Sequence, residues 1–580
     1  MRNWLMSRAG PIAAAAICCS TPSIAKPSDS MARLSSDIVA YQLRANPFLP
    51  LVADVKGGRN DGFIDVSPAA IARDQATVDA LLVRLGAIDP DEIADKGDRL
   101  DYYLAREMLE ADKGLRVCRN ELWSVSHMSG WPSAFPELVE RQPVASAKDR
   151  ADALARWGAF PGFIASDIAN LKRGLARGYS APRSVAVRTL AQVEGLIAAT
   201  PEESPFYAPA AATRNRAFKA RFAALVRDRI TPAIKTYRDF LKRYIPAART
   251  SMSVLDLPNG RACYDAWLRN YTTLDRPGEA VAALGEKTVA ANVADIRAIG
   301  QKLYGTDDYA AIMKRVKDDP SERFASKDEV VAFNREIEGR AEAATAGLVD
   351  VVPTQRLEVR AMTGGMEASG ASSHYLPEPD PAKPALYSLQ AGKLEDARRA
   401  VMAITAVHEG YPGHHLQFAY AARIEASPLS RLSGNSAYVE GWARYAERMA
   451  DEIDLLATPQ AKISRRAWPA RGMVVDPGIH LGRWSREKAV AYLLSTGLRS
   501  ETQAQEMVDR IAIIPGQLTA YDSGGLEIVA LRDQARAALG ARFALKQFNA
   551  IVLGDGVVPL ALLRHNVEAW IAAGQGANPH

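Results

Sequence analysis

Residues 408–415 read His-Glu-Gly-Tyr-Pro-Gly-His-His and hold three of the eight histidines in this 580-residue chain. Neutral imidazoles are preferred protein ligands for zinc, and a carboxylate beside them can serve as a base. A lone buried histidine usually only satisfies a core, but three histidines and a glutamate around a Pro-Gly break are difficult to explain as packing. The stretch therefore predicts a metal site and, with it, a zinc-dependent hydrolase.

The spacing of these histidines departs from that of the usual zinc-peptidase helix. There the second histidine follows the first by four residues, but here that position is Pro412. A regular helix cannot aim His408 and His414 at one ion, whereas proline breaks the hydrogen-bond ladder and glycine accepts unusual torsions. We expect a bulge at Pro412 and Gly413 that returns His414 to the metal. His415 is the rival ligand, and the histidine that does not bind metal would support the site or contact substrate.

The first histidine is expected on a helix that runs from Ala397 towards Tyr411, with Asp396 as its N-cap. The buried face of this helix would carry His408 and Glu409 into the interior. Glu409 follows a presumed ligand directly. Its expected role is to take a proton from the attacking water and pass it to the leaving amine.

A second acidic motif supplies the third ligand. Residues 438–447 read Tyr-Val-Glu-Gly-Trp-Ala-Arg-Tyr-Ala-Glu, and they predict a helix with Ser436 as its N-cap. Glu440 would complete a site of two histidines and one glutamate that keeps an open coordination position. Glu447 lies two turns further on the same face and could orient a ligand. The expected cofactor is one Zn²⁺ per chain, although such sites accept several divalent ions.

Most of the chain predicts helix, so the expected fold is mostly α. An example is one apolar face with steps of three and four residues, formed by Val289, Val293, Ile296, Ile299 and Leu303. Strand signals are confined to 357–361 and 385–390, on either side of a Gly/Ser/Pro-rich loop at 363–384. They predict a small β-hairpin or sheet beside the histidine helix, and the edge of such a sheet can hold an extended peptide.

The domain organisation follows from the breaks in the helical pattern. Residues 201–211 form the clearest loop or linker. We therefore expect a single helical domain over 26–580, with two halves, about 26–211 and 212–580, around a cleft.

Composition excludes several classes of function. The chain is 48% hydrophobic and 24% charged, with a net charge of only +5, which gives no reason to expect nucleic acid as a partner. No segment after the N-terminal region is apolar enough to span a membrane. The expected partner is a peptide substrate.

The N-terminus has the pattern of a signal peptide. Arg2 and Arg8 precede a short apolar stretch, and residues 23–25 fit the small-x-small cleavage pattern, so we expect cleavage after Ala25 and a periplasmic or secreted protein. Two cysteines remain after this segment, Cys118 and Cys263. An exported compartment permits a disulfide between them, and two unpaired buried thiols are the alternative.

Several of these runs resemble a known bacterial family. They are HEGYPGHHLQ (408–417), YVEGWARYAE (438–447), RGMVVDPGIHLGRW (471–484), PGQLTAY (515–521), 539–560 and 230–275. They resemble the domain of unknown function 885 family, whose members are predicted to be zinc metallopeptidases. The resemblance implies a mostly helical fold similar to zinc oligopeptidases and carboxypeptidases whose third ligand is glutamate. The chain departs from it at Asn549, where similar sequences often have histidine, and at Asp522, where they often have lysine.

Three more residues are candidates for the site. Tyr521, His480 and Arg471 could each stabilise a developing oxyanion. Tyr521 adjoins residues 522–525 (Asp-Ser-Gly-Gly), which are expected to be a flexible segment able to close over substrate. Arg471 could instead bind the terminal carboxylate of a peptide, or pair with Asp476.

The sequence thus predicts an exported zinc metallopeptidase that cleaves peptide bonds of oligopeptides, with water activated by Glu409. Two alternatives stay open. One is a zinc amidohydrolase that acts on a non-peptide amide or a cell-wall fragment. The other is a catalytically inactive binding protein.

Overall fold

The structure, a computed structural model, describes residues 27–574 except 54, 363–366, 368–371, 379 and 381. It is mostly helical with one small sheet, as the sequence predicts. The predicted signal peptide lies outside the described residues. Within the described part of the chain, no helix has both the length and the apolarity needed to cross a membrane.

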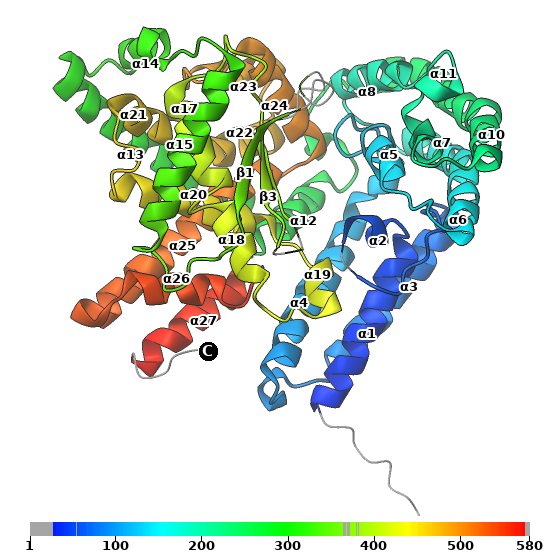
Figure 1. Ribbon diagram of the computed structural model, residues 1–580, viewed down its shortest axis with the longest axis horizontal. Coiled ribbons are helices and arrows are strands. Elements are labelled where there is room, and N and C mark those ends of the chain that lie inside the picture. The colour runs from blue at the N-terminus through cyan, green and yellow to red at the C-terminus, as the bar shows by residue number, and fades with distance from the viewer. Residues whose placement is uncertain are drawn as a thin grey trace, which may run out of the picture.

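Figure 1 shows two lobes, the blue-to-teal part of the chain on one side and the green-to-red part on the other. The first lobe contains α1 (Pro27–Ala45), α2 (Leu49–Val52), α3 (Pro68–Leu85), α4 (Lys96–Leu115), α5 (Trp131–Glu140), α6 (Ala147–Gly158), α7 (Phe160–Ala176), α8 (Arg183–Gly195), α9 (Ala208–Ala211), α10 (Arg216–Leu225) and α11 (Thr231–Ala247).

The predicted linker at 201–211 is part of the core of this lobe. It folds into short 3-10 and α-helical turns, and Phe206 packs against Trp157 and Phe160 with ring centroids 5.7 and 5.4 Å apart. The same buried cluster continues through α11 to Ala248. The Pro-rich composition therefore marks turns whose aromatic side chain is buried, and the structure places the lobe boundary after Ala248 rather than at 211.

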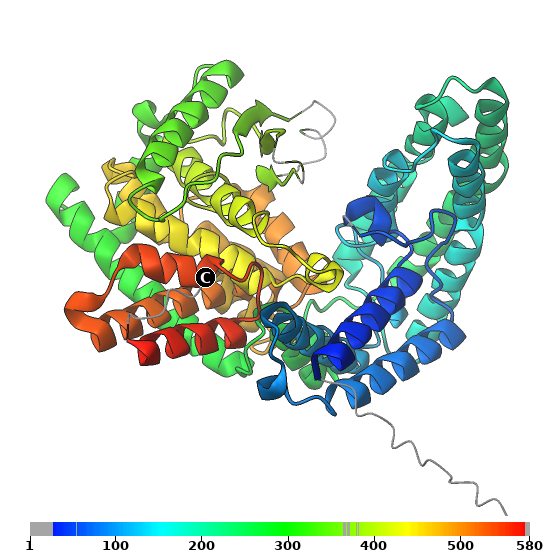
Figure 2. The same ribbon diagram turned by 60° about the horizontal axis from the view of Figure 1, so that its bottom comes forward.

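The second lobe holds the metal-binding motifs. Its helices are α12 (Gly260–Thr272), α13 (Gly278–Tyr304), α14 (Tyr309–Asp318), α15 (Lys327–Thr345), α17 (Arg399–Glu409), α18 (His414–Ala421), α19 (Pro428–Leu432), α20 (Ser436–Glu452), α21 (Pro459–Ala467), α22 (Arg471–His480), α23 (Arg486–Leu494), α24 (Glu501–Ile513), α25 (Gln517–Leu539), α26 (Leu545–Leu553) and α27 (Leu560–Ala573). Figure 2 shows the same two lobes from below.

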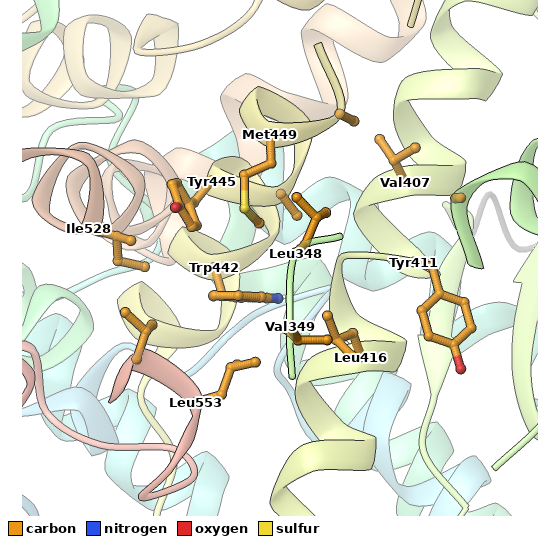
Figure 3. Close-up of a cluster of buried hydrophobic side chains, with 14 of the residues drawn as sticks. Leu348, Val349, Val407, Tyr411, Leu416, Trp442, Tyr445, Met449, Ile528 and Leu553 are labelled. Carbon is orange, nitrogen blue, oxygen red and sulfur yellow. The ribbon is translucent and has the colours of Figure 1, made fainter. Parts of the chain in front are cut away.

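Helix α20 lies in the centre of the second lobe. Trp442, Tyr445 and Met449 project from it into a buried cluster that includes Val407 of α17 and Leu416 of α18 (Figure 3). Dense packing of this kind leaves little freedom in side-chain position. The core therefore holds the histidine helices and α20 in one arrangement.

The sheet has three strands, β1 (Leu357–Ala361), β2 (His374–Leu376) and β3 (Ala385–Leu389), in the order β1-β3-β2. Both predicted strands are present, but β1 and β3 run parallel, so the expected hairpin is wrong. The third strand, β2, lies within the predicted loop and pairs antiparallel with β3. Three residues are too few for an alternation pattern to reveal a strand.

A disulfide joins Cys118, at the end of the 3-10 turn Arg116–Cys118, to Cys263 of α12. Of the two alternatives that the sequence left open, the structure shows the bond. It connects the segment after α4 to a helix of the second lobe.

Candidate metal centre

The histidine motif folds as two short helices with a break between them. Helix α17 begins two residues later than predicted, because Arg398 is extended and acts as its N-cap. It ends at Glu409, and α18 begins at His414. The peptide between Tyr411 and Pro412 is cis. A regular helix is therefore interrupted by a turn rather than by a bulge.

Two glycines permit this turn. A Cβ on Gly413 would lie 2.0 Å from the carbonyl oxygen of His408, and a Cβ on Gly410 would lie 2.0 Å from the carboxylate of Glu338. Glu338, on α15, also accepts a hydrogen bond from the backbone N–H of Tyr411 at 3.0 Å. Nothing in the sequence around Glu338 marks it as a support of the site.

The turn brings three potential ligands together. One ligand atom each of His408, His414 and Glu440 lies within 4.8 Å of the others. Oε2 of Glu440 is 3.4 Å from Nε2 of His408 and 3.5 Å from Nε2 of His414. Glu440 comes from α20, whose N-cap is Asn435 rather than the predicted Ser436, because the Asn435 side chain accepts from the backbone N–H of Tyr438.

Neighbouring side chains orient the two imidazoles. Nδ1 of His408 lies 2.9 Å from Oε1 of Glu447, and Nδ1 of His414 lies 3.4 Å from Oε1 of Gln417. Glu447 in turn accepts from Nη1 of Arg444 at 2.8 and 3.0 Å. When an oxygen accepts from Nδ1–H, the lone pair of the imidazole is at Nε2, which is the nitrogen that faces Glu440.

The charges of the cluster fit a bound cation. Oε2 of Glu440 is buried without a hydrogen-bond partner. Burial disfavours a charged imidazole, but hydrogen bonds to Glu440 and Glu447 outweigh it and raise the pKa of His408 to about 10. Burial also opposes ionisation of Glu440, yet bonds from His408 and His414 hold its pKa well below the usual range. Two imidazoles and one carboxylate form a donor set that zinc takes in catalytic sites, and binding of a cation there displaces the proton.

His415 has different partners from His414. Its Nδ1 lies 3.2 Å from the hydroxyl of Tyr375, and its Nε2 lies 3.0 Å from the carbonyl oxygen of Gln355. Burial lowers the pKa of His415 to about 4 against the effect of the Gln355 bond. Since both ring nitrogens are occupied, His415 supports the turn from behind.

Glu409 lies at the end of α17, beside His408. Its Oε2 accepts a hydrogen bond from the backbone N–H of Tyr375, in strand β2, at 2.8 Å. Its other oxygen has no hydrogen-bond partner among the described residues. The strand thus orients the carboxylate and leaves one oxygen free to accept a proton. Tyr375 could not be identified from the sequence, because its strand carries no recognisable pattern.

Tyr521 lies beside the metal centre. Its hydroxyl accepts from Nη2 of Arg510 at 3.3 Å, and the guanidinium of Arg444 lies 5.7 Å from its ring centroid. Burial and the charge of Glu440 raise the pKa of Tyr521. The neighbouring residues 522–525, however, are buried within α25 and packed against α20. The expected flexible segment is therefore wrong, because helix packing there leaves no room for a loop.

His480 and Arg471 have partners elsewhere. His480 is fully buried: Nε2 lies 3.1 Å from the carbonyl oxygen of Ile511, and Nδ1 accepts from the N–H of Val254 at 3.3 Å. Burial lowers its pKa to about 3. The contacts of Arg471 are with Ala467, Tyr309 and Tyr492, whereas those of Asp476 are with Tyr264 and Gly516. None of these contacts reaches the three clustered ligands, and Arg471 does not pair with Asp476.

A cavity of about 490 Å³ is lined by residues of α4, α12 and the segment after α19. None of the clustered ligands and none of the predicted catalytic residues lines it. The cavity is therefore separate from the candidate metal centre.

The fold is similar to those of two solved structures, each described as a "putative lipoprotein". The protein from Colwellia psychrerythraea has a TM-score of 0.83 at 21% identity, with 94% of this chain and 99% of that chain covered. The protein from Shewanella oneidensis has a TM-score of 0.76 at 20% identity, with 92% and 99% covered. A third, an oligoendopeptidase F candidate from Bacillus anthracis, reaches a TM-score of only 0.25 at 10% identity, too low to establish a common fold.

No curated protein matches the chain. A family model does match it, over residues 50–567, which is most of its length. This confirms the resemblance that the histidine and glutamate motifs suggest. The chain belongs to the family described as "Bacterial protein of unknown function (DUF885)".

Proposed function

We propose that this protein is a zinc-dependent metallopeptidase whose metal is held by His408, His414 and Glu440. The observation that carries the proposal is a buried carboxylate oxygen without a hydrogen-bond partner, which lies between two imidazole nitrogens. Three protein ligands leave a fourth position open for water or substrate, as catalytic zinc sites require. Glu447 and Gln417 hold the imidazoles in place.

The residues around the cluster supply the remaining chemistry. When bound, zinc lowers the pKa of water and polarises the scissile carbonyl. The free oxygen of Glu409 takes the proton of the attacking water and passes it to the leaving nitrogen. The hydroxyl of Tyr521 accepts from Arg510, so its own hydrogen is available to the developing oxyanion.

Strand β2 favours a peptide as the substrate. It is an edge strand, and its Tyr375 N–H already contacts Glu409. An extended peptide can add to such an edge by main-chain hydrogen bonds, which would place an amide bond beside Glu409. Small non-peptide amides lack this repeating backbone.

We also propose that the protein is exported. The N-terminal charge and cleavage pattern supports this, and so does the disulfide, because such bonds persist in oxidising compartments. The description of the two similar structures as lipoproteins points the same way.

The decisive experiment separates metal binding from chemistry. Glu409→Gln keeps the size of the side chain and removes the base, so zinc should stay at about one per chain while turnover of an oligopeptide mixture falls roughly a hundredfold or more. His408→Ala should lose the zinc. Glu336→Gln, on the exposed face of α15, is the matched control and should change neither.

Elemental analysis and mass spectrometry of the peptide products give the two readouts. Loss of zinc in Glu409→Gln would make Glu409 a ligand. Unchanged turnover would assign the base to another group. Cleavage of N-acyl amino acids without cleavage of peptides would replace the peptidase by an amidohydrolase.

A further inference from the structure

Two arginines near Tyr521 have no carboxylate partner among the described residues. Arg510 lies on α24, and Arg499 precedes that helix. Nε of each is buried and has no hydrogen-bond partner. By contrast, the nearby Arg444 donates to both oxygens of Glu447 and lies 3.7 Å from Asp522. Guanidinium groups with unpaired buried nitrogens are costly unless an anion neutralises them.

The known contacts of the two arginines orient them without neutralising them. Arg510 donates from Nη2 to the side-chain oxygen of Gln517 and to the hydroxyl of Tyr521. The guanidinium carbon of Arg499 lies 3.9 Å from the ring centroid of Trp468, a stacked arrangement that leaves its edge available. Both side chains are only partly exposed.

The two charges lie close together. Burial and the charges of Arg444 and Arg510 lower the pKa of Arg499 to about 10, so it stays cationic at neutral pH. The carboxyl of Asp476 senses the charge of Arg510 but forms no ion pair with it. Asp476 is instead occupied by Tyr264 and Gly516, and burial raises its pKa to about 7. The pair thus carries uncompensated positive charge.

Tyr521 connects these cations to the metal centre. It accepts from Arg510 on one side, and on the other side its pKa responds to the charge of Glu440. Arg444 lies over the same ring and holds Glu447, which orients His408. An anion bound by the pair would therefore lie on the Tyr521 side of the three ligands.

We propose that Arg499 and Arg510 form a carboxylate-binding subsite that takes the C-terminal carboxylate of the peptide substrate. The inference rests on the proposed function, since it identifies which part of a peptide the site recognises. Guanidinium groups bind carboxylates through paired hydrogen bonds, and a planar fork with free nitrogens is preorganised for this. A terminal carboxylate held beside the metal centre places a bond near the C-terminus at the site, so the enzyme would remove residues from that end.

A binding experiment tests the subsite apart from catalysis. The zinc-loaded Glu409→Gln protein is titrated by calorimetry with N-acetyl-tetra-alanine as the free acid and as the C-terminal amide. A third probe, an acetylated tetrapeptide amide with an internal glutamate, presents a carboxylate from a side chain. We expect the free acid to bind at least tenfold more tightly than either amide.

Variants assign the preference to the arginines. Arg499→Gln and Arg510→Gln should each remove most of it, and Arg510→Lys should keep only part, because a lysine cannot bind in a paired manner. Arg315→Gln is the control: this exposed arginine also stacks on an aromatic ring, that of Tyr304, and should leave the preference unchanged. Melting curves identify any variant that is unfolded.

Equal binding of acid and amide would overturn the proposal, as would a preference that survives in both glutamine variants. An arginine-dependent preference for the internal glutamate would overturn the assignment to the C-terminus. If the acid preference holds but the unmodified protein cleaves no peptide, the subsite stands and the proposed peptidase function fails.

Discussion

His414 and His415 are neighbours in the sequence but have different surroundings in the structure. His414 presents Nε2 to Glu440, whereas both nitrogens of His415 are occupied by Tyr375 and Gln355. The break at Pro412 sets this difference, because it determines which of the two side chains faces α20. Sequence spacing alone left both as candidate ligands.

The two histidines should therefore respond differently to substitution. We expect His414→Ala to lose zinc, because it removes one of three ligands. His415→Ala should retain zinc and instead lower the free energy of unfolding by about 1–3 kcal/mol, since it leaves buried polar partners unsatisfied. Zinc content after dialysis and thermal unfolding measure the two effects, and the reverse pattern would make His415 the ligand.

His480 is a second histidine whose role depends on its environment. Its folded-state pKa is about 3, whereas an unfolded chain titrates near 6.5. The unfolded state thus binds more protons between these values, so the stability that neutral His480 contributes is complete above about pH 6.5 and is lost as the pH falls towards 3. The destabilisation caused by His480→Gln should shrink by up to about 1.4 kcal/mol per pH unit as the pH falls from 6.5 to 4.

Asp476, on the same helix, is the matched control with the opposite sign. Burial raises its pKa to about 7, so the stability contributed by its protonated form is present at low pH and is lost as the pH rises through 7. The cost of Asp476→Asn should therefore shrink as the pH rises. Calorimetric unfolding across the pH range measures both trends, and a pH-independent cost of His480→Gln would contradict the structural role. Turnover of the folded His480→Gln protein should be normal.

At the scale of elements, the contact between α20 and α25 holds the third ligand in place. A Cβ on Gly441 would lie 2.5 Å from the carbonyl carbon of Gly524, and one on Gly524 would lie 1.7 Å from the carbonyl oxygen of Ala437. The neighbours in both cases are backbone atoms, which cannot move aside as a flexible side chain can. Only glycine at these positions lets the helices approach so closely, one residue from Glu440.

Gly441→Ala should separate the two helices and disturb the metal centre. We expect a loss of about 1–3 kcal/mol or more in the free energy of unfolding, typical of overpacking, together with weaker zinc binding. Gly339→Ala is the control, because a Cβ there meets nothing within 4 Å and its exposed helical position should gain about 0.5–1 kcal/mol. Thermal unfolding and zinc titration test the pair. A Gly441→Ala protein as stable as the parent would show that the helices do not need this contact.

At the scale of the whole molecule, the two lobes meet around α12. Buried side chains from the first lobe, such as Trp123 and Tyr179, share a cluster with Tyr264 and Leu268 of α12. The disulfide between Cys118 and Cys263 closes a sequence separation of 145 residues at the same place. Core packing and a covalent bond therefore both connect the lobes.

Removal of the disulfide should weaken the molecule without emptying the metal centre. A Cys118→Ala/Cys263→Ala protein is expected to lose about 2–5 kcal/mol in the free energy of unfolding, because a cross-link over a long loop restricts the unfolded chain. Reduction of the parent protein should produce the same shift in melting temperature. Zinc content should be unchanged in both. Identical melting curves with and without the bond would show that it contributes no stability.

The sequence by itself determined the helical class, the two motif helices and the residues able to bind metal. Helical periodicity and the chemistry of histidine and glutamate are local properties, so they can be read without the fold. The supporting residues Glu338, Tyr375 and Gln355 carry no local signal and could not be predicted.

Only the tertiary structure decided between His414 and His415, paired β1 with β3 in parallel and joined the two cysteines. It also turned residues 522–525 from an expected loop into packed helix, and placed Arg499 and Arg510, rather than Arg471, beside Tyr521. The physical reason is the same in each case. These outcomes depend on contacts between segments far apart in the chain, and neither propensity nor spacing encodes such contacts.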